Sequence, residues 1–209
     1  MEGTHAIIVG HSFVKRYDHW LAGSLTMAPT PQDICEQLSS LHLLGKSGMM
    51  TDELNEDSLI HEATKYDIVI IDCGTNDLSQ AMPVREVVNN VFVFARRCQL
   101  AGVKETVITS VLQRKHRIQM SPDAFTELAR DYNNQMKRRC DMETGISFHR
   151  HRGFAEHLGT LPALNTWSTD GIHPEEKRST PASKSGMEKY HASIKTALHR
   201  AIHRINYNQ

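Results

Sequence analysis

The fold class is decided by residues 67–73, DIVIIDC, whose middle is an uninterrupted run of aliphatic side chains followed directly by Gly74. A strand with one face in water alternates apolar and polar residues, whereas a run without polar interruption is typical of a strand covered on both faces. Such strands belong to parallel sheets with helices on either side. The stretch therefore predicts a buried central strand of an α/β domain.

Similar short apolar runs lie on both sides of this stretch and alternate with longer segments of helical periodicity. The expected strands are residues 6–9, 41–44, 67–73, 106–111 and 146–149, and the expected helices are residues 14–25, 51–65, 83–101, 122–143 and 185–205. The last helix carries an apolar stripe at steps of three or four that predicts a face packed on the core: Met187, Tyr190, Ile194, Leu198, Ile202 and Ile205. This alternation predicts parallel strands joined by helical crossovers.

The composition fits a single domain over residues 1–209, with enough chain to bury a substantial core. Lysine plus arginine number 24 and aspartate plus glutamate also number 24, so no net charge draws the chain to nucleic acid or anionic lipid. The sequence has neither a basic leader with an apolar run nor a membrane-length apolar run, which favours a cytoplasmic protein. The widely spaced Cys35, Cys73, Cys98 and Cys140 favour buried, reduced thiols over disulfides or a zinc knuckle.

The first candidate chemical cluster is GHSF at residues 10–13, where the first strand passes through a glycine into a helix. The Ser12 hydroxyl would then lie at the strand tip, where a nucleophile can reach a substrate carbonyl. The Ser12 backbone N–H, near a helix N-terminus, could bond the oxyanion that forms. A serine that only caps the helix explains the same four residues.

Two further clusters follow the second and third expected strands. GKSG at residues 45–48 is a glycine-containing turn that presents backbone N–H groups, although it lacks the full phosphate-loop pattern. GTND at residues 74–77 places the Asn76 amide, a neutral donor suited to an oxyanion, directly after the strongest strand. A plain turn would use the same residue types.

The fourth cluster is DGIHP at residues 170–174, in which Asp170 and His173 lie three residues apart. One turn of chain can bring the carboxylate and the imidazole into hydrogen-bonding contact, so Asp170 would orient His173 while the other ring nitrogen takes the Ser12 proton. The neighbouring glycine and proline favour a fixed loop over a helix interior. Alone, the pattern could also be an incidental loop histidine.

In this order, the four clusters resemble the four sequence blocks of the SGNH (GDSL-like) hydrolase family, and the resemblance covers nearly the whole chain. It implies a three-layer α/β/α fold with a flavodoxin-like five-stranded parallel sheet. It also implies a catalytic triad of Ser12, Asp170 and His173, working through an acyl-enzyme and needing no metal or organic cofactor.

The resemblance further implies an oxyanion hole formed by the Ser12 N–H, the Gly48 N–H and the Asn76 amide. Gly48 is preferred to Gly45 because the family's donor glycine usually follows a small residue such as Ser47, although either glycine could serve.

One residue departs from the family pattern, because His11 stands where the usual first block has an aspartate. An imidazole cannot accept several backbone hydrogen bonds as a carboxylate does, so the departure concerns the geometry around Ser12. We expect His11→Asp, which restores the usual residue, to retain activity. The variant GHSFVKR (residues 10–16), with DGIHP and GMEKYH (residues 186–191), resembles esterase domains in open reading frames of animal LINE-type retrotransposons. That resemblance implies one domain of a longer protein.

Two functional classes follow from these observations. The first is an esterase acting on acetyl or short acyl esters, and the second is a module that uses the same pocket to bind a lipid or acyl group with little turnover. We expect a small ester or lipid as ligand and no direct nucleic-acid binding, while peripheral membrane contact and the oligomeric state stay open.

Two weaker patterns have ordinary interpretations. FHRHR at residues 148–152 could suggest a metal or phosphate site, but no third ligand is evident, and a solvated rim or channel wall is favoured for His149 and His151. The basic residues 113–119 and 137–139 lack interleaved aromatic side chains and are interpreted as a solvated face.

Overall fold

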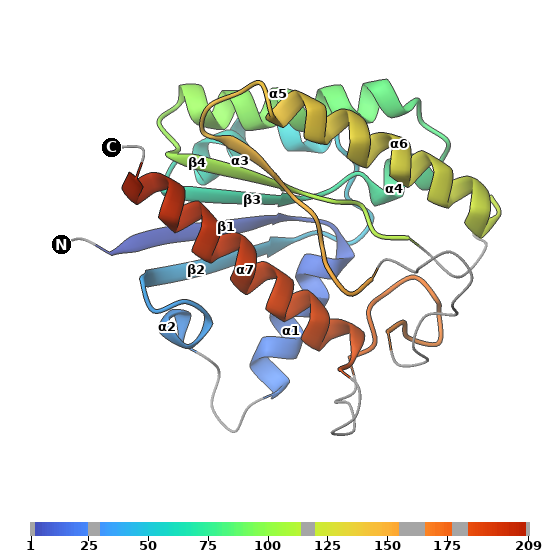
Figure 1. Ribbon diagram of the computed structural model, residues 1–209, viewed down its shortest axis with the longest axis horizontal. Coiled ribbons are helices and arrows are strands. Elements are labelled where there is room, and N and C mark those ends of the chain that lie inside the picture. Colours follow the sequence, from blue (N-terminus) through green and yellow to red (C-terminus); the bar gives the residue numbers. More distant parts are fainter. Residues whose placement is uncertain (1–2, 25–29, 114–119, 155–165, 177–183, 208–209) are drawn as a thin grey trace.

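Five strands form one parallel sheet in the order β2-β1-β3-β4-β5 in the computed structural model of the chain (Figure 1). The structure describes residues 3–24, 30–113, 120–154, 166–176 and 184–207. The strands are β1 (Thr4–Gly10), β2 (Leu38–Gly45), β3 (Ile68–Asp72), β4 (Glu105–Thr109) and β5 (Ile146–His149). The predicted fold class is confirmed, since every predicted strand is present and all pairings are parallel.

Helices cover both faces of the sheet (Figure 1). The described helices are α1 (Ser12–Ser24), α2 (Pro31–Ile34), α3 (Asp57–Ala63), α4 (Thr75–Ser79), α5 (Val84–Leu100), α6 (Pro122–Cys140) and α7 (Gly186–Tyr207), with a 3-10 turn η1 (Glu53–Asn55). One core cluster joins α1, α2 and α7 to one face, and another joins α3, α4, α5 and α6 to the other. This is the three-layer α/β/α arrangement.

The packing of β3 on both of its faces explains why its aliphatic run is unbroken. Ile68 and Ile70 pack into the cluster that contains α7, whereas Val69 and Ile71 pack into the cluster that contains α5. Because helices cover both faces of the sheet, every residue of β3 is buried and neither face requires polar side chains.

The last helix also follows its predicted pattern. Five members of the apolar stripe are buried, namely Met187, Tyr190, Ile194, Leu198 and Ile202. The sixth, Ile205, is partly buried and packs against them. The stripe is therefore core packing, as predicted. The four cysteines are likewise free and buried, as expected.

Some boundaries differ from the prediction for local reasons. The expected helix over residues 51–65 is divided into η1 and α3, because Asp52 caps the turn and Glu56 adopts an extended backbone that begins a new helix. The short helices α2 and α4 were not predicted, since neither is long enough to show a hydrophobic period. No helix in the described part of the chain is long and apolar enough to cross a membrane.

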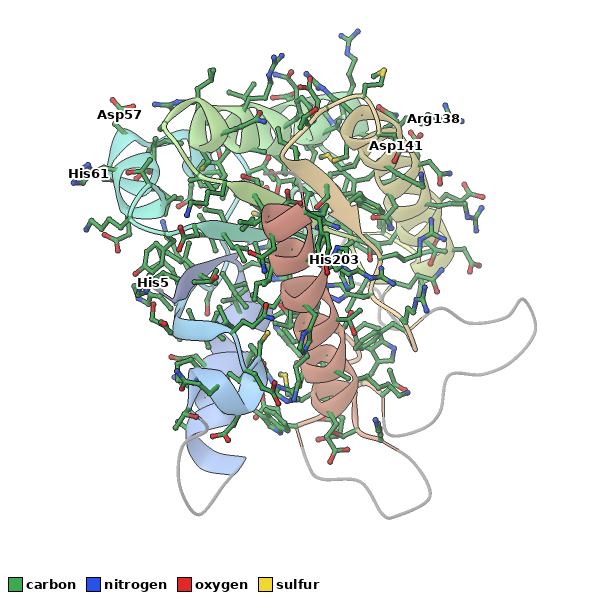
Figure 2. All side chains as sticks on the ribbon, turned by 60° about the vertical axis from the view of Figure 1, so that its left-hand side comes forward. His5, Asp57, His61, Arg138, Asp141 and His203 are labelled. Atoms are coloured by element: carbon green, nitrogen blue, oxygen red, sulfur yellow. The ribbon has the colours of Figure 1, made fainter. Side chains whose placement is uncertain are left out.

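The predicted solvated face of α6 is confirmed for two of its three basic residues. Lys137 and Arg138 are exposed, and Figure 2 shows Arg138 and Asp141 on the outer side of the helix. Arg139 instead lies over the ring of Phe92, 4.1 Å from its centroid. Residues 114–119 of the predicted basic run lie outside the described residues.

Candidate active site

The Ser12 hydroxyl lies at the carboxyl end of the sheet, between the tips of β1 and its neighbours. β1 ends at Gly10, the His11 N–H donates to the Asp72 carbonyl of β3 at 3.2 Å, and α1 begins at Ser12. The Ser12 Oγ is 2.9 Å from Nε2 of His173, across 161 residues of chain. In the described residues the hydroxyl thus engages an imidazole instead of capping its own helix.

His173 is held by Asp170 on its other side, with His173 Nδ1 2.6 Å from Asp170 Oδ2. The other carboxylate oxygen accepts hydrogen bonds from Ser168 Oγ at 2.7 Å, Ile172 N at 2.8 Å and His173 N at 2.9 Å. Burial acts to raise the pKa of Asp170, but these hydrogen bonds outweigh it and hold the pKa well below the usual range. An ionised Asp170 can only accept, so His173 Nδ1 carries the proton and the Nε2 lone pair faces Ser12.

The turn that carries Asp170 and His173 is closed by backbone hydrogen bonds. The Ser168 N–H donates to the His173 carbonyl at 2.8 Å, and Trp167 forms a β-bridge with Pro174. The Met187 N–H, in the first turn of α7, donates to the Glu175 carbonyl at 2.9 Å. The turn is therefore attached to the start of the last helix, which fixes the height of His173 above the sheet.

The two candidate glycines of residues 45–48 have different roles. A Cβ on Gly45 would lie 2.2 Å from the Lys15 nitrogen, so Gly45 allows α1 to approach the tip of β2. Gly48 has open space around it and a φ of +77°, a left-handed conformation that favours glycine. Gly48 lines the same cavity as Ser12, whereas Gly45 does not. Of the two glycines, Gly48 is therefore the one that lies at the candidate site.

Asn76 lies in the same cavity, on α4, and its amide also supports the loop that carries Gly48. The Nδ2 group donates to the Met49 carbonyl at 2.9 Å. That bond uses one of the two amide hydrogens and leaves the second for a ligand. Ser12, Gly48, Asn76 and His173 thus surround one space, with Asp170 reaching it through His173.

Asp77 and Thr51, to which the sequence analysis gave no role, anchor the Gly48 loop from behind. Asp77 Oδ1 accepts from the Thr51 N–H at 2.9 Å and from the Thr51 hydroxyl at 2.6 Å, and both residues are fully buried. Burial raises the pKa of Asp77, and the two bonds from Thr51 act against that shift. The only sequence signal was the acidic residue after Asn76, which a turn explains equally well.

His11 is buried beside another carboxylate, that of Asp72. Its Nδ1 accepts from the Phe13 N–H at 3.4 Å, and its Nε2 lies 3.7 Å from Asp72 Oδ1. Asp72 is buried too, and burial raises its pKa, although the field of His151 and a hydrogen bond from the Tyr190 hydroxyl lower it. An imidazole at position 11 therefore faces a carboxylate supplied by the neighbouring strand.

The prediction of a solvated rim at His149 and His151 is wrong, whereas its alternative, a channel wall, agrees for His151 alone, which lines a second cavity. Both side chains are buried, and both rings contact the Ser193 hydroxyl of α7 at 2.9 Å. Burial lowers the pKa of each to about 4; cationic neighbours of His149, chiefly Arg200, add to its shift, whereas Asp72 opposes that of His151. Among the described residues, no group of three or more His, Cys, Asp or Glu side chains could hold a metal ion. The alternating histidines are part of the interior, while Arg150 and Arg152 between and after them are exposed.

The cavity in front of Ser12 has a volume of about 560 Å³. Besides the residues already described, its walls contain side chains that the sequence analysis did not assign: Lys15, Arg16, His19, Ser47, Ser79, Gln80 and Ile172. Lys15, Arg16 and His19 could have been found from their helical spacing to Ser12, which places all four on one face of α1.

Solved structures of esterases and lipases share this fold. A GDSL-like lipase from Bacteroides thetaiotaomicron matches with a TM-score of 0.60 at 18% identity, over 95% of this chain and 89% of its own. A psychrotrophic esterase from a Pseudoalteromonas species, inhibited by monoethylphosphonate, matches with a TM-score of 0.61 at 16% identity, over 94% and 99%. A carbohydrate esterase of family 3 from Talaromyces cellulolyticus matches with a TM-score of 0.58 at 14% identity, over 95% and 98%.

At these identities the match concerns architecture: the chain has the α/β fold found in GDSL-like lipolytic hydrolases. No protein-family model and no curated protein matches the sequence.

Proposed function

We propose that the protein is a serine esterase that hydrolyses acetyl or other short acyl esters through an acyl-enzyme. The observation that carries the proposal is the unbroken hydrogen-bonded chain from Ser12 through His173 to Asp170, which opens onto a cavity. The esterases and lipases among the structures of the same fold support a hydrolase acting on esters. Residue roles rest on the chemistry of the site itself.

In the proposed mechanism, Ser12 Oγ attacks the ester carbonyl while His173 Nε2 takes its proton. Asp170 stabilises the resulting imidazolium. The negative charge that develops on the carbonyl oxygen is stabilised by the N–H groups of Ser12 and Gly48 and by the second amide hydrogen of Asn76. Collapse of the tetrahedral intermediate breaks the bond to the alcohol, which leaves with the proton from His173. A water molecule, deprotonated by His173, then attacks the acyl-enzyme carbonyl; the bond to Ser12 Oγ breaks, His173 returns the proton to Ser12, and the acid leaves.

The lining of the cavity supports a short acyl group. Ile172 is the one aliphatic side chain among the described lining residues, and the remainder are polar, basic or glycine. A long acyl chain gains affinity from apolar walls, at roughly 0.8 kcal/mol for each buried methylene, and these walls offer little of that surface. An acetyl group needs no such surface.

Hydrolysis of p-nitrophenyl acetate tests the proposal. We expect Ser12→Ala to lower kcat by at least about a thousandfold, since the nucleophile is lost. The matched control is Ser58→Ala, which removes an exposed hydroxyl from α3 and should keep the full rate. Equal rates for wild type and Ser12→Ala would refute the esterase proposal.

A serine-reactive p-nitrophenyl phosphonate gives a second readout, because the covalent adduct should be found by mass spectrometry on the peptide that contains Ser12. Binding of an acyl ester without turnover and without an adduct would instead support the alternative of a binding module.

The wider context of the chain stays a prediction. This applies to the resemblance to retrotransposon esterase domains, to a place in a longer protein, to a cytoplasmic location and to the lack of direct nucleic-acid binding. The last is tested by a gel-shift titration with single-stranded RNA, where we expect no retarded band at physiological salt.

A further inference from the structure

One wall of the cavity is built by a single face of α1. Ser12, Lys15, Arg16 and His19 all line the cavity, at spacings of three, four and seven residues from the nucleophile. Because an α-helix rises about 1.5 Å per residue, this wall extends about 10 Å along the helix, from Ser12 to His19. Gly45 packs directly against the backbone of Lys15, so the helix is held at a fixed distance from the tip of β2. The basic side chains are therefore placed in a defined direction from the reacting centre.

The charges on this wall are not all balanced. Arg16 Nη1 donates to Glu176 Oε1 at 3.0 Å, and its Nη2 lies 3.6 Å from Asp170 Oδ2, so its charge is largely satisfied. Lys15 is exposed and has no carboxylate within ion-pairing distance among the described residues. His19, also exposed, adds ring N–H donor capacity one turn further along.

The opposite wall supplies no negative charge. Its side chains are neutral and polar, namely Ser47, Asn76, Ser79 and Gln80, and no aspartate or glutamate is among the described residues that line the cavity. A cavity lined with one sign of charge attracts ligands of the opposite sign. The space next to Ser12 thus favours an anion over a neutral group.

We propose that the ester substrate carries an anionic group of the phosphate class, bound by Lys15 one helical turn from the scissile carbonyl with His19 as a further donor. This inference rests on the proposed esterase function and names the substrate class of the same site. The phosphate can belong to a soluble phosphate monoester or to the headgroup of a lipid that carries a short acyl ester, and the test distinguishes these sources.

The experiment compares two acetyl esters that differ in charge, 2-acetoxyethyl phosphate and the neutral 2-methoxyethyl acetate, by following acetate release. We expect kcat/KM to be about fivefold higher for the phosphate, since an ion pair at a solvent-accessible site contributes up to about 1 kcal/mol. The difference should lie mainly in KM and shrink as salt rises, because the Debye length is about 8 Å at physiological ionic strength.

Charge variants assign the preference to its residue. The ratio of the two kcat/KM values should fall to about one in Lys15→Gln and below one in Lys15→Glu. The matched control is Lys104→Gln, which removes the same charge at the amino end of β4, where Lys104 pairs with Asp67 at 2.8 Å. That control should keep the wild-type ratio.

A third arm uses vesicles of phosphatidylcholine that contain 1-hexadecyl-2-acetylglycerol 3-phosphate, a lipid that joins an acetyl ester to an anionic phosphate headgroup. Lys15-dependent hydrolysis on these vesicles, in excess of that of the soluble phosphate ester, would assign the group to a lipid headgroup, and the reverse result would assign it to a soluble phosphate ester.

The outcomes separate the two proposals. Equal kcat/KM values for charged and neutral esters in both arms, or a preference that Lys15→Glu leaves intact, would overturn the inference while Ser12-dependent hydrolysis still upheld the esterase. Hydrolysis that survives Ser12→Ala would overturn the proposed function. If neither ester is turned over, calorimetric binding of 2-acetoxyethyl phosphate decides: weaker binding by Lys15→Glu supports the phosphate site, and equal affinities refute it.

Discussion

Replacing Thr51 with valine tests whether the loop that carries Gly48 is held from behind. The substitution keeps the volume and the backbone N–H but removes a hydroxyl that donates to Asp77 at 2.6 Å and accepts from Asn90 at 3.2 Å. A buried hydrogen bond to a carboxyl group is worth about 1.5–3 kcal/mol, whereas the half-buried Asn90 amide can turn to water at a cost of roughly 0.5 kcal/mol. We therefore expect Thr51→Val to lower the free energy of unfolding by about 2–3.5 kcal/mol.

Urea unfolding at neutral pH, followed by circular dichroism, measures this loss, and a thermal scan should show a Tm lower by roughly 5–10 °C for a chain of this size. The control is Thr196→Val, which removes an exposed hydroxyl bonded to the Ala192 carbonyl at 2.9 Å on α7 and should cost less than about 0.5 kcal/mol. If the esterase proposal holds, kcat should fall more than KM rises, because an oxyanion donor acts mainly in the transition state. A loss below about 1 kcal/mol would refute the reasoning.

Two further predictions concern buried histidines. The pKa of His149 and of His151 is lowered to about 4, against about 6.5 when unfolded, so between pH 6.5 and pH 4 the unfolded state binds protons that the folded state does not. Urea titrations should show stability falling as pH drops through this window, by up to about 3 kcal/mol per histidine, with a shallower fall in His151→Gln; a flat profile would contradict the assignment. His11→Asp, which family resemblance alone expects to be tolerated, should instead lower both Tm and esterase rate, because the new carboxylate lies beside buried Asp72. Adding Asp72→Asn to His11→Asp should restore both the Tm and the esterase rate. If His11→Asp alone kept the wild-type Tm and rate, the contact between His11 and Asp72 would contribute no stability.

The fold was predictable because its strongest signal is local. A strand buried on both faces, such as β3, is recognised from a run of consecutive apolar residues. The buried face of α7 is recognised from apolar residues at helical spacing. The environment of His149 and His151 was not predictable in the same way. Their burial depends on Ser193 and the rest of α7, more than 40 residues further along the chain, so the alternating pattern of strand β5 looked like an exposed rim.

The candidate site shows the same division. Ser12, Asp170 and His173 could be named from their motifs, and the structure brings them into one hydrogen-bonded chain. The residues that contact the motif residues were not predictable, because strand register and packing place them. Asp72 faces His11 because β3 lies beside β1. Ser168 donates to Asp170 because of the form of the turn. Short motifs contain the candidate reacting groups, whereas the residues that support them are set by contacts that a linear pattern does not contain.

The attachment of the His173 turn to the first residues of α7 has a consequence for protein synthesis. Ser12 is made early, but the turn that carries His173, its proposed base, is attached to α7 only when Met187 has been added. A ribosome that adds about 5–20 residues per second needs on the order of ten to thirty seconds between those two points. In the proposed esterase, Ser12 would lack a fixed general base throughout that interval, so hydrolysis would begin only after Met187 has been translated.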